Sequence, residues 1–159
     1  MRKKDEAERL TKEDLKKIVN SVESKTITRE ILQLKNKCLT AISRDQFAKY
    51  RDNLIFRMLF KAVQRPGAIA NLTVEEFDNG VWDETTQPAL FTTQTSFHKT
   101  SSSEGEATLF WNKKNYRLAK IYQSKICPLV ATDESAKLPS IPGAHVNGSA
   151  FFVSFTGNR

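Results

Sequence analysis

The segment RDNLIFRMLFKAVQRPGAIANLTVEEF, residues 51–77, decides how this chain folds. Residues 54–60 within it are nearly all apolar, which predicts a central, buried helix over about Gln46 to Val63. Arg65-Pro66-Gly67 then interrupts the pattern, because proline disfavours helical geometry in the preceding residue but suits the first turn of a new helix. We therefore predict a short helix from Pro66 to Asn71, with the Arg65 guanidinium at a helix start that favours an anion such as phosphate.

Two helices are expected before this segment. Leu10-Thr11 with Asp14 is typical of a capping box, which predicts a helix over about Lys12 to Val22. After residues 23–27, Thr28 is expected to cap a second helix. Its apolar stripe would consist of Ile31, Leu34, Cys38 and Ile42.

From Glu75 onward the pattern changes to short runs rich in Val, Trp, Phe and Thr, separated by turn residues. This pattern predicts a β-hairpin with strands over about 89–98 and 107–111 and a turn within 101–105. The fold class is therefore α+β: a helical N-terminal half, a small antiparallel hairpin sheet and a further helix.

The further helix is expected over about 112–129 and is basic. Proline and glycine in residues 131–149 favour a surface loop, and residues 151–155 are typical of a short buried strand. Residues 1–9 alternate charges without an apolar face, so we expect a flexible, charged N-terminus. One domain is predicted over residues 10–159.

The charge of the chain favours a polyanionic partner. Its 25 Lys and Arg residues outnumber 18 Asp and Glu, and the formal net charge is +7. Cys38 and Cys127 are too few for a disulfide framework and lack the spacing of a zinc site, so we expect reduced thiols and no metal. No apolar run is long enough to cross a membrane, so no membrane partner is expected.

The order of these features resembles the first half of a tyrosine recombinase (phage integrase type) catalytic domain. That family has a buried helix, a turn with the first catalytic arginine, a short helix ending in a leucine, an acidic stretch, and a β-hairpin with a catalytic lysine. Arg65 matches the arginine, Leu72 the leucine, Glu75-Glu76-Phe77 the acidic stretch, and Lys99 the lysine. The basic helix after the hairpin is most similar to eukaryotic transposon-derived members such as the Crypton type.

The resemblance implies DNA strand transfer through a 3′ phosphotyrosyl intermediate, without a metal or small-molecule cofactor, in a homo-oligomeric synaptic complex. Arg65 would neutralise the scissile phosphate and Lys99 would protonate the leaving 5′ oxygen. The family's later box, a histidine or lysine followed by an arginine, and its tyrosine nucleophile would come after residues 151–155. The sequence ends at Arg159, so we expect an incomplete domain that does not cut DNA alone. Ala68 also stands where many members have an acidic residue.

Duplex DNA is the expected partner, and Arg2-Lys3-Lys4 agrees weakly with import into the nucleus. Four residues of the basic helix are expected to follow the DNA backbone: Lys113, Lys114, Arg117 and Lys120.

Plainer interpretations stay open. Arg65 would otherwise pair with Glu75 or Glu76, Lys99 would be an exposed residue at a strand end, and a basic helix face is as often only solvated. For the whole chain, the alternatives are a domesticated, non-catalytic DNA-binding or protein-interaction module and a basic domain that binds an acidic protein. The aromatic residues Tyr50, Tyr116, Tyr122, Trp82 and Trp111 are expected to pack rather than to react or stack on bases.

Overall fold

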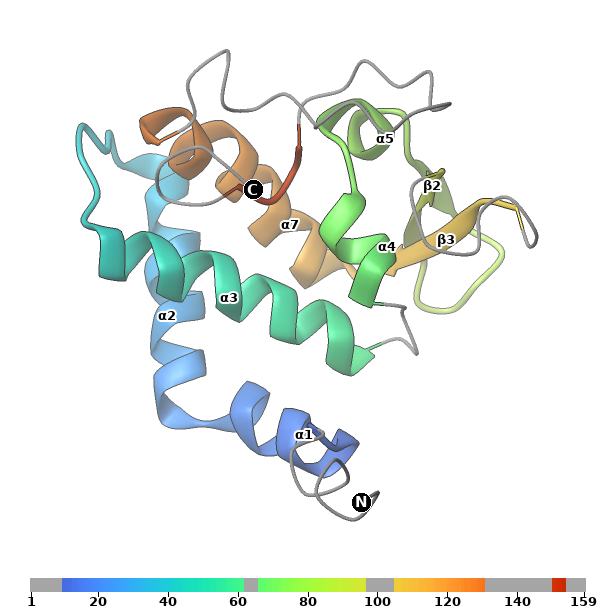
Figure 1. The fold of residues 1–159 in the computed structure, drawn as a ribbon, viewed down its shortest axis with the longest axis horizontal. Coiled ribbons are helices and arrows are strands. Elements are labelled where there is room, and N and C mark those ends of the chain that lie inside the picture. The colour runs from blue at the N-terminus through green and yellow to red at the C-terminus, as the bar shows by residue number, and fades with distance from the viewer. Residues whose placement is uncertain (1–9, 62–65, 97–104, 131–149, 154–159) are drawn as a thin grey trace, which may run out of the picture.

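The computed structural model describes residues 10–61, 66–96, 105–130 and 150–153. Within these ranges the chain has the predicted α+β fold: helices precede and follow a small three-stranded antiparallel sheet. In Figure 1 the long helices lie on one side and the sheet on the other, with α4 between α3 and the strands. The predictions for residues 1–9 and 131–149 lie outside the described residues.

The first helix, α1 (Lys12–Asn20), begins at the predicted capping box. The Asp14 N–H donates to the Thr11 hydroxyl at 3.1 Å, and the Thr11 N–H donates to the Asp14 carboxylate at 3.0 Å. Ser21 is extended, so it ends α1, and its hydroxyl accepts from the Ser24 N–H at the start of α2 (Val22–Gln33). The predicted helix end at Val22 and the linker over 23–27 are therefore wrong.

The predicted cap at Thr28 is also wrong, because this residue lies inside α2 and its hydroxyl donates to the Ser24 carbonyl at 2.7 Å. A 3₁₀ turn, η1 (Leu34–Asn36), ends the helix before Cys38. Ile31 and Leu34 are buried as predicted, whereas Cys38 is exposed and Ile42 is half-buried outside any helix. Apolar residues thus recur at helical spacing through residues 37–43, although this connection to the next helix is not helical.

The central helix, α3 (Arg44–Lys61), confirms the main prediction from the 51–77 segment. Its start is earlier than predicted, because the Ser43 hydroxyl accepts from the Gln46 N–H at 3.2 Å. The helix contacts α1, α2, α4 and α7. As predicted for a central helix, it has an apolar stripe that is buried, formed by Phe47, Tyr50, Leu54 and Met58.

The short helix α4 (Pro66–Asn71) has the predicted bounds. Ala68 is fully buried in it, which explains why an acidic side chain does not suit this position. Leu72 is buried next, and Thr73 caps an additional short helix, α5 (Val74–Asp78). The acidic stretch is therefore helical, with Phe77 turned into the core.

The sheet is a meander of β1 (Val81–Asp83), β2 (Leu90–Thr95) and β3 (Ala107–Trp111) in the order β1-β2-β3. Both neighbouring pairs are antiparallel, and Phe91 lies opposite Trp111. The return strand of the hairpin has the predicted bounds. Residues 97–104, which include the predicted end of the first strand and most of the turn, lie outside the described ranges.

The basic helix, α7 (Lys113–Ile121), starts where Asn112 accepts from the Asn115 N–H at 2.8 Å. It continues as a π-helical turn, η2 (Tyr122–Ile126), and a 3₁₀ turn, η3 (Cys127–Leu129), so the predicted extent is right although the geometry changes.

The predicted strand over 151–155 is replaced, in its described part, by an isolated bridge. Ala150 pairs with Thr73, and the Phe151 N–H donates to the Leu72 carbonyl at 2.9 Å. Ala150, Phe151 and the two residues that follow are buried, so the segment still closes the core.

Aromatic side chains fill the space between the helices and the sheet. The Phe77 ring lies 5.0 Å from Trp111 and 4.8 Å from Phe151, measured between ring centroids. The packing expected for the tyrosines is confirmed, because Tyr50 and Tyr122 are buried and Tyr116 stacks on Phe77. Trp111 is fully buried, but Trp82 stays 37% exposed at the edge of the core.

Candidate nucleic-acid interface

The two predicted catalytic residues, Arg65 and Lys99, lie outside the described residues. The described elements next to them are close together, because α4, which begins directly after Arg65, contacts β3, the return strand of the hairpin. Arg65 and Lys99 therefore stay predictions, while their flanking elements belong to one packed unit.

Glu76 was a possible ion-pair partner for Arg65, and its carboxylate already accepts two backbone hydrogen bonds. One oxygen accepts from the Thr73 N–H at 3.0 Å, and the other accepts from the Ser96 N–H at 2.9 Å. Glu76 thus caps α5 and holds the end of β2, just before the segment that carries Lys99.

The basic helix α7 has two distinct faces. Its buried face carries Asn115, Leu118, Ala119 and Ile121, which pack into the fold. The exposed face carries all four residues that the sequence predicts to contact DNA. Positions 113, 117 and 120 follow the spacing of one helical stripe, whereas position 114 lies to one side. The α7 stripe is defined as Lys113, Arg117 and Lys120.

The cations of this helix differ in their partners. The Lys120 ammonium donates to the Asp78 carboxylate at 3.2 Å and lies 5.5 Å from the centroid of the Phe77 ring. The side chains of Lys113 and Arg117 form no hydrogen bond or ion pair with any described residue. Two charges of the α7 stripe are therefore free to meet an anion, and the third is partly neutralised.

A further cation, Arg57, lies on α3 beside this helix. Its side chain is only 8% exposed, and one guanidinium N–H donates to the Ser24 hydroxyl at 3.3 Å. Its Nε–H has no acceptor among the described residues. Burial lowers the pKa of Arg57, and burial followed by the charge of Arg57 lowers the pKa of Lys114. The positive charge of Arg57 on α3 therefore acts on Lys114 of α7.

Arg57 was missed in the sequence, although a signal was available: it is the one charged residue within LIFRMLF, residues 54–60. Its place is fixed by a polar network between α2 and α3. The Ser24 hydroxyl donates to Asn53 at 2.6 Å, and the Asn53 amide donates to the Thr28 hydroxyl at 3.1 Å. Buried polar groups need such partners, so the network sets how α2 and α3 pack.

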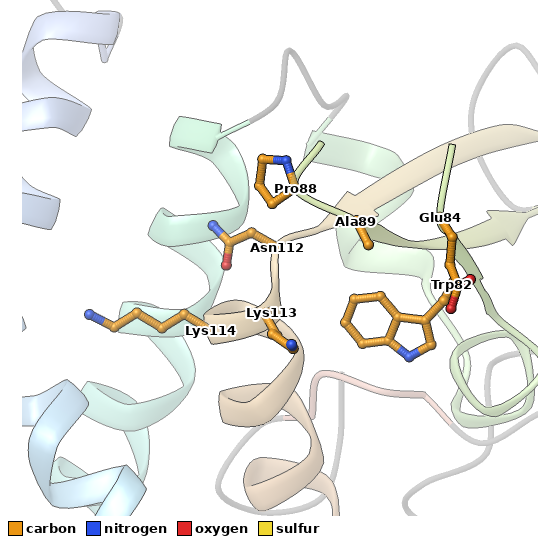
Figure 2. Close-up of a pocket in the computed structure, with 7 residues that line it drawn as sticks. All are labelled: Trp82, Glu84, Pro88, Ala89, Asn112, Lys113 and Lys114. Atoms are coloured by element: carbon orange, nitrogen blue, oxygen red, sulfur yellow. The ribbon is translucent and has the colours of Figure 1, made fainter. Parts of the chain in front are cut away.

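Among the described residues, two hollows beside α7 have its cations in their lining. The first, of about 490 Å³, includes Trp82, Lys113 and Lys114 in its lining and is drawn in Figure 2. The second, of about 480 Å³, lies between α2 and α7 and includes Lys35 and Arg117. Both hollows therefore combine positive charge with apolar or aromatic walls.

No family model, curated protein or solved structure matches this chain in the comparisons with known proteins. Within the described ranges, no helix is long and apolar enough to cross a membrane. The same residues contain no group of three or more His, Cys, Asp or Glu side chains placed to hold a metal ion.

Proposed function

We propose that this chain is a tyrosine-recombinase-like domain that binds duplex DNA through the backbone phosphates. The observation that carries the proposal is the α7 stripe, in which Lys113 and Arg117 are exposed and have no partner among the described residues. Exposed cations without counter-charges release the condensed counterions of DNA when they bind phosphates, and this release drives association.

The geometry of the stripe suits a charged backbone. The helix rises about 1.5 Å per residue, so the stripe extends roughly 10 Å from its first to its last cation. Its Arg117 can bind a phosphate with two N–H groups, whereas Lys113 acts as a point charge. None of these contacts reads a base, so binding is expected to be nonspecific in sequence.

The order of elements supports the recombinase part of the proposal. A buried α3 precedes α4 at Pro66, α4 leads to the buried Leu72, and the β2–β3 hairpin precedes the basic α7. On this proposal Arg65 and Lys99 contribute to a strand-transfer site, and this chain alone does not cut DNA. A homo-oligomeric synapse and a nuclear location belong to the same proposal.

The test measures binding to a labelled duplex by fluorescence anisotropy at a series of salt concentrations. The double variant Lys113→Ala, Arg117→Ala should reduce the slope of log K against log salt by about 2, one unit for each phosphate that the variant no longer neutralises. Lys25→Ala is the control, because Lys25 is an exposed cation on α2 and does not belong to this stripe. Binding that is independent of salt, or an equal reduction per charge in the control, would reject the proposal.

A non-catalytic protein-interaction module is the second candidate. The hollow between α2 and α7 favours it, because Leu32 and Ile121 give that hollow an apolar lining while Lys35 and Arg117 add positive charge. An acidic amphipathic segment would suit such a groove. Tight binding of an acidic peptide without measurable binding to duplex DNA would favour this candidate over the first.

A further inference from the structure

A second kind of nucleic-acid contact is suggested by the hollow in Figure 2, which lies between the β1–β2 connection and the start of α7. Its volume of about 490 Å³ is in the range of small-molecule sites. The lining residues are Trp82, Glu84, Pro88, Ala89, Asn112, Lys113 and Lys114.

The apolar part of this lining includes one aromatic ring. Trp82 is 37% exposed, so part of this large aromatic residue is open to a ligand. Its ring lies 5.0 Å from Tyr116 and 5.5 Å from Phe91 between centroids, so packing holds it in place. Pro88 and Ala89 add further apolar surface. A rigid exposed aromatic beside apolar walls suits a flat, stacking ligand.

Opposite charges line the same hollow. Glu84 and Lys113 each form no hydrogen bond or ion pair with a described residue, and so they are not neutralised by each other. Figure 2 shows Lys114 extending away from Trp82, which leaves Lys113 as the other cation of this lining. A ligand with an anionic group and an amino group would satisfy both charges.

We infer that this hollow holds one unpaired nucleotide, with its base on Trp82, its exocyclic amine on Glu84 and its phosphate on Lys113. Cytosine and adenine have such an amine, whereas thymine has a carbonyl oxygen at the corresponding edge. The inference rests on the proposed function, since it takes DNA as the partner, and it adds a single-stranded or flipped-out nucleotide to duplex binding.

Tryptophan fluorescence of the full chain is the first test. The chain has two tryptophans, and Trp111 is fully buried, so contact quenching reports on Trp82. We expect a dC₁₀ strand to quench this signal and to bind about fivefold more tightly than dT₁₀. A parallel titration with free dCMP shows whether the hollow also binds a free nucleotide or binds only a nucleotide within a strand. Equal affinity for dC₁₀ and dT₁₀, with no quenching by either, would overturn the inference.

Variants of the hollow give the second test. Trp82→Leu should weaken binding of dC₁₀ about tenfold, and Trp82→Phe should restore most of it, because a phenyl ring still stacks. Arg117→Ala is the matched control: it weakens duplex binding, but Arg117 does not line this hollow, so quenching by dCMP should persist. The midpoint of thermal unfolding, measured for each variant, shows whether that variant is folded.

The two proposals fail separately. Loss of salt-dependent duplex binding, with quenching by dCMP retained, would reject the proposed function and assign the hollow to a free nucleotide. Unchanged dC₁₀ affinity in Trp82→Leu, with duplex binding intact, would reject only the nucleotide site.

Discussion

The Glu76 carboxylate accepts a hydrogen bond from the Ser96 backbone N–H at 2.9 Å and thereby joins α5 to the end of β2. The same side chain accepts from the Thr73 N–H at 3.0 Å, which completes a capping box. One carboxylate therefore fixes both the start of a helix and the strand end that leads to the proposed Lys99 position. The position of this strand end therefore depends on the same side chain that caps α5.

We predict that Glu76→Ala lowers the free energy of unfolding by about 1 to 2 kcal/mol, because it removes the cap and leaves the Ser96 N–H without its acceptor. Chemical denaturation measures the change. Glu75→Ala is the control, since Glu75 is exposed on the same helix, and it should alter stability by no more than about 0.5 kcal/mol. A similar loss in both variants would show that the capping interaction is not responsible.

Asp78→Asn should strengthen duplex binding about two- to fivefold, because it removes the carboxylate that neutralises Lys120. Stability should fall by less than about 1 kcal/mol, as expected for an exposed ion pair. Glu75→Gln is the control, because it removes a negative charge from the same helix and leaves the ion pair of Lys120 with Asp78 intact. Anisotropy titrations at fixed salt compare the two, and equal gains would indicate a general charge effect only.

Two glycine substitutions should change stability in opposite directions. A Cβ at Gly80 would lie 2.7 Å from the Thr92 carbonyl oxygen and would also collide with the Phe91 ring, so Gly80→Ala should cost about 1 to 3 kcal/mol. A Cβ at Gly67 meets nothing within 4 Å, and this residue lies in α4. Gly67→Ala should therefore stabilise by up to about 1 kcal/mol. Thermal unfolding of both variants tests the pair.

The two thiols should differ in reactivity. Cys38 is exposed, whereas burial raises the pKa of Cys127 to about 11 from 9.0. At pH 8 a thiol reagent should label Cys38 at least about tenfold faster, because the thiolate is the reactive form. Since the folded pKa is raised, the associated stability is present below pH 9 and is lost as pH rises toward 11. Fast labelling of Cys127 in the folded protein would contradict this assignment.

Arg65→Ala should weaken capture of a nicked duplex or phosphate mimic far more than Lys113→Ala, because Arg65 is proposed to meet the scissile phosphate. Lys99→Ala should leave DNA affinity nearly unchanged here and yet cripple cleavage of a suicide substrate in a protein that also carries the nucleophile. Equal affinity losses for Arg65→Ala and Lys113→Ala would contradict the assignment of Arg65 to the scissile phosphate.

Local signals predicted part of this fold well. Proline at position 66 set the start of α4, and the Thr11–Asp14 pair set the start of α1. Both helix starts depend on backbone geometry within a few residues, so they can be predicted from the local sequence. By contrast, apolar spacing did not locate the end of α2 before Cys38, because the same spacing occurs in a helix and in a segment that packs without being helical.

The sequence alone determined the α+β class, the buried α3, the short helix at Pro66 and the excess of positive charge, because periodicity, proline geometry and composition are local properties of the chain. Only the tertiary structure placed Arg57 beside Lys114, paired Lys120 with Asp78, and put Glu84 and Lys113 around one hollow with Trp82. These relationships join residues far apart in the chain, and they depend on how α2, α3, α7 and the sheet pack around a shared aromatic core.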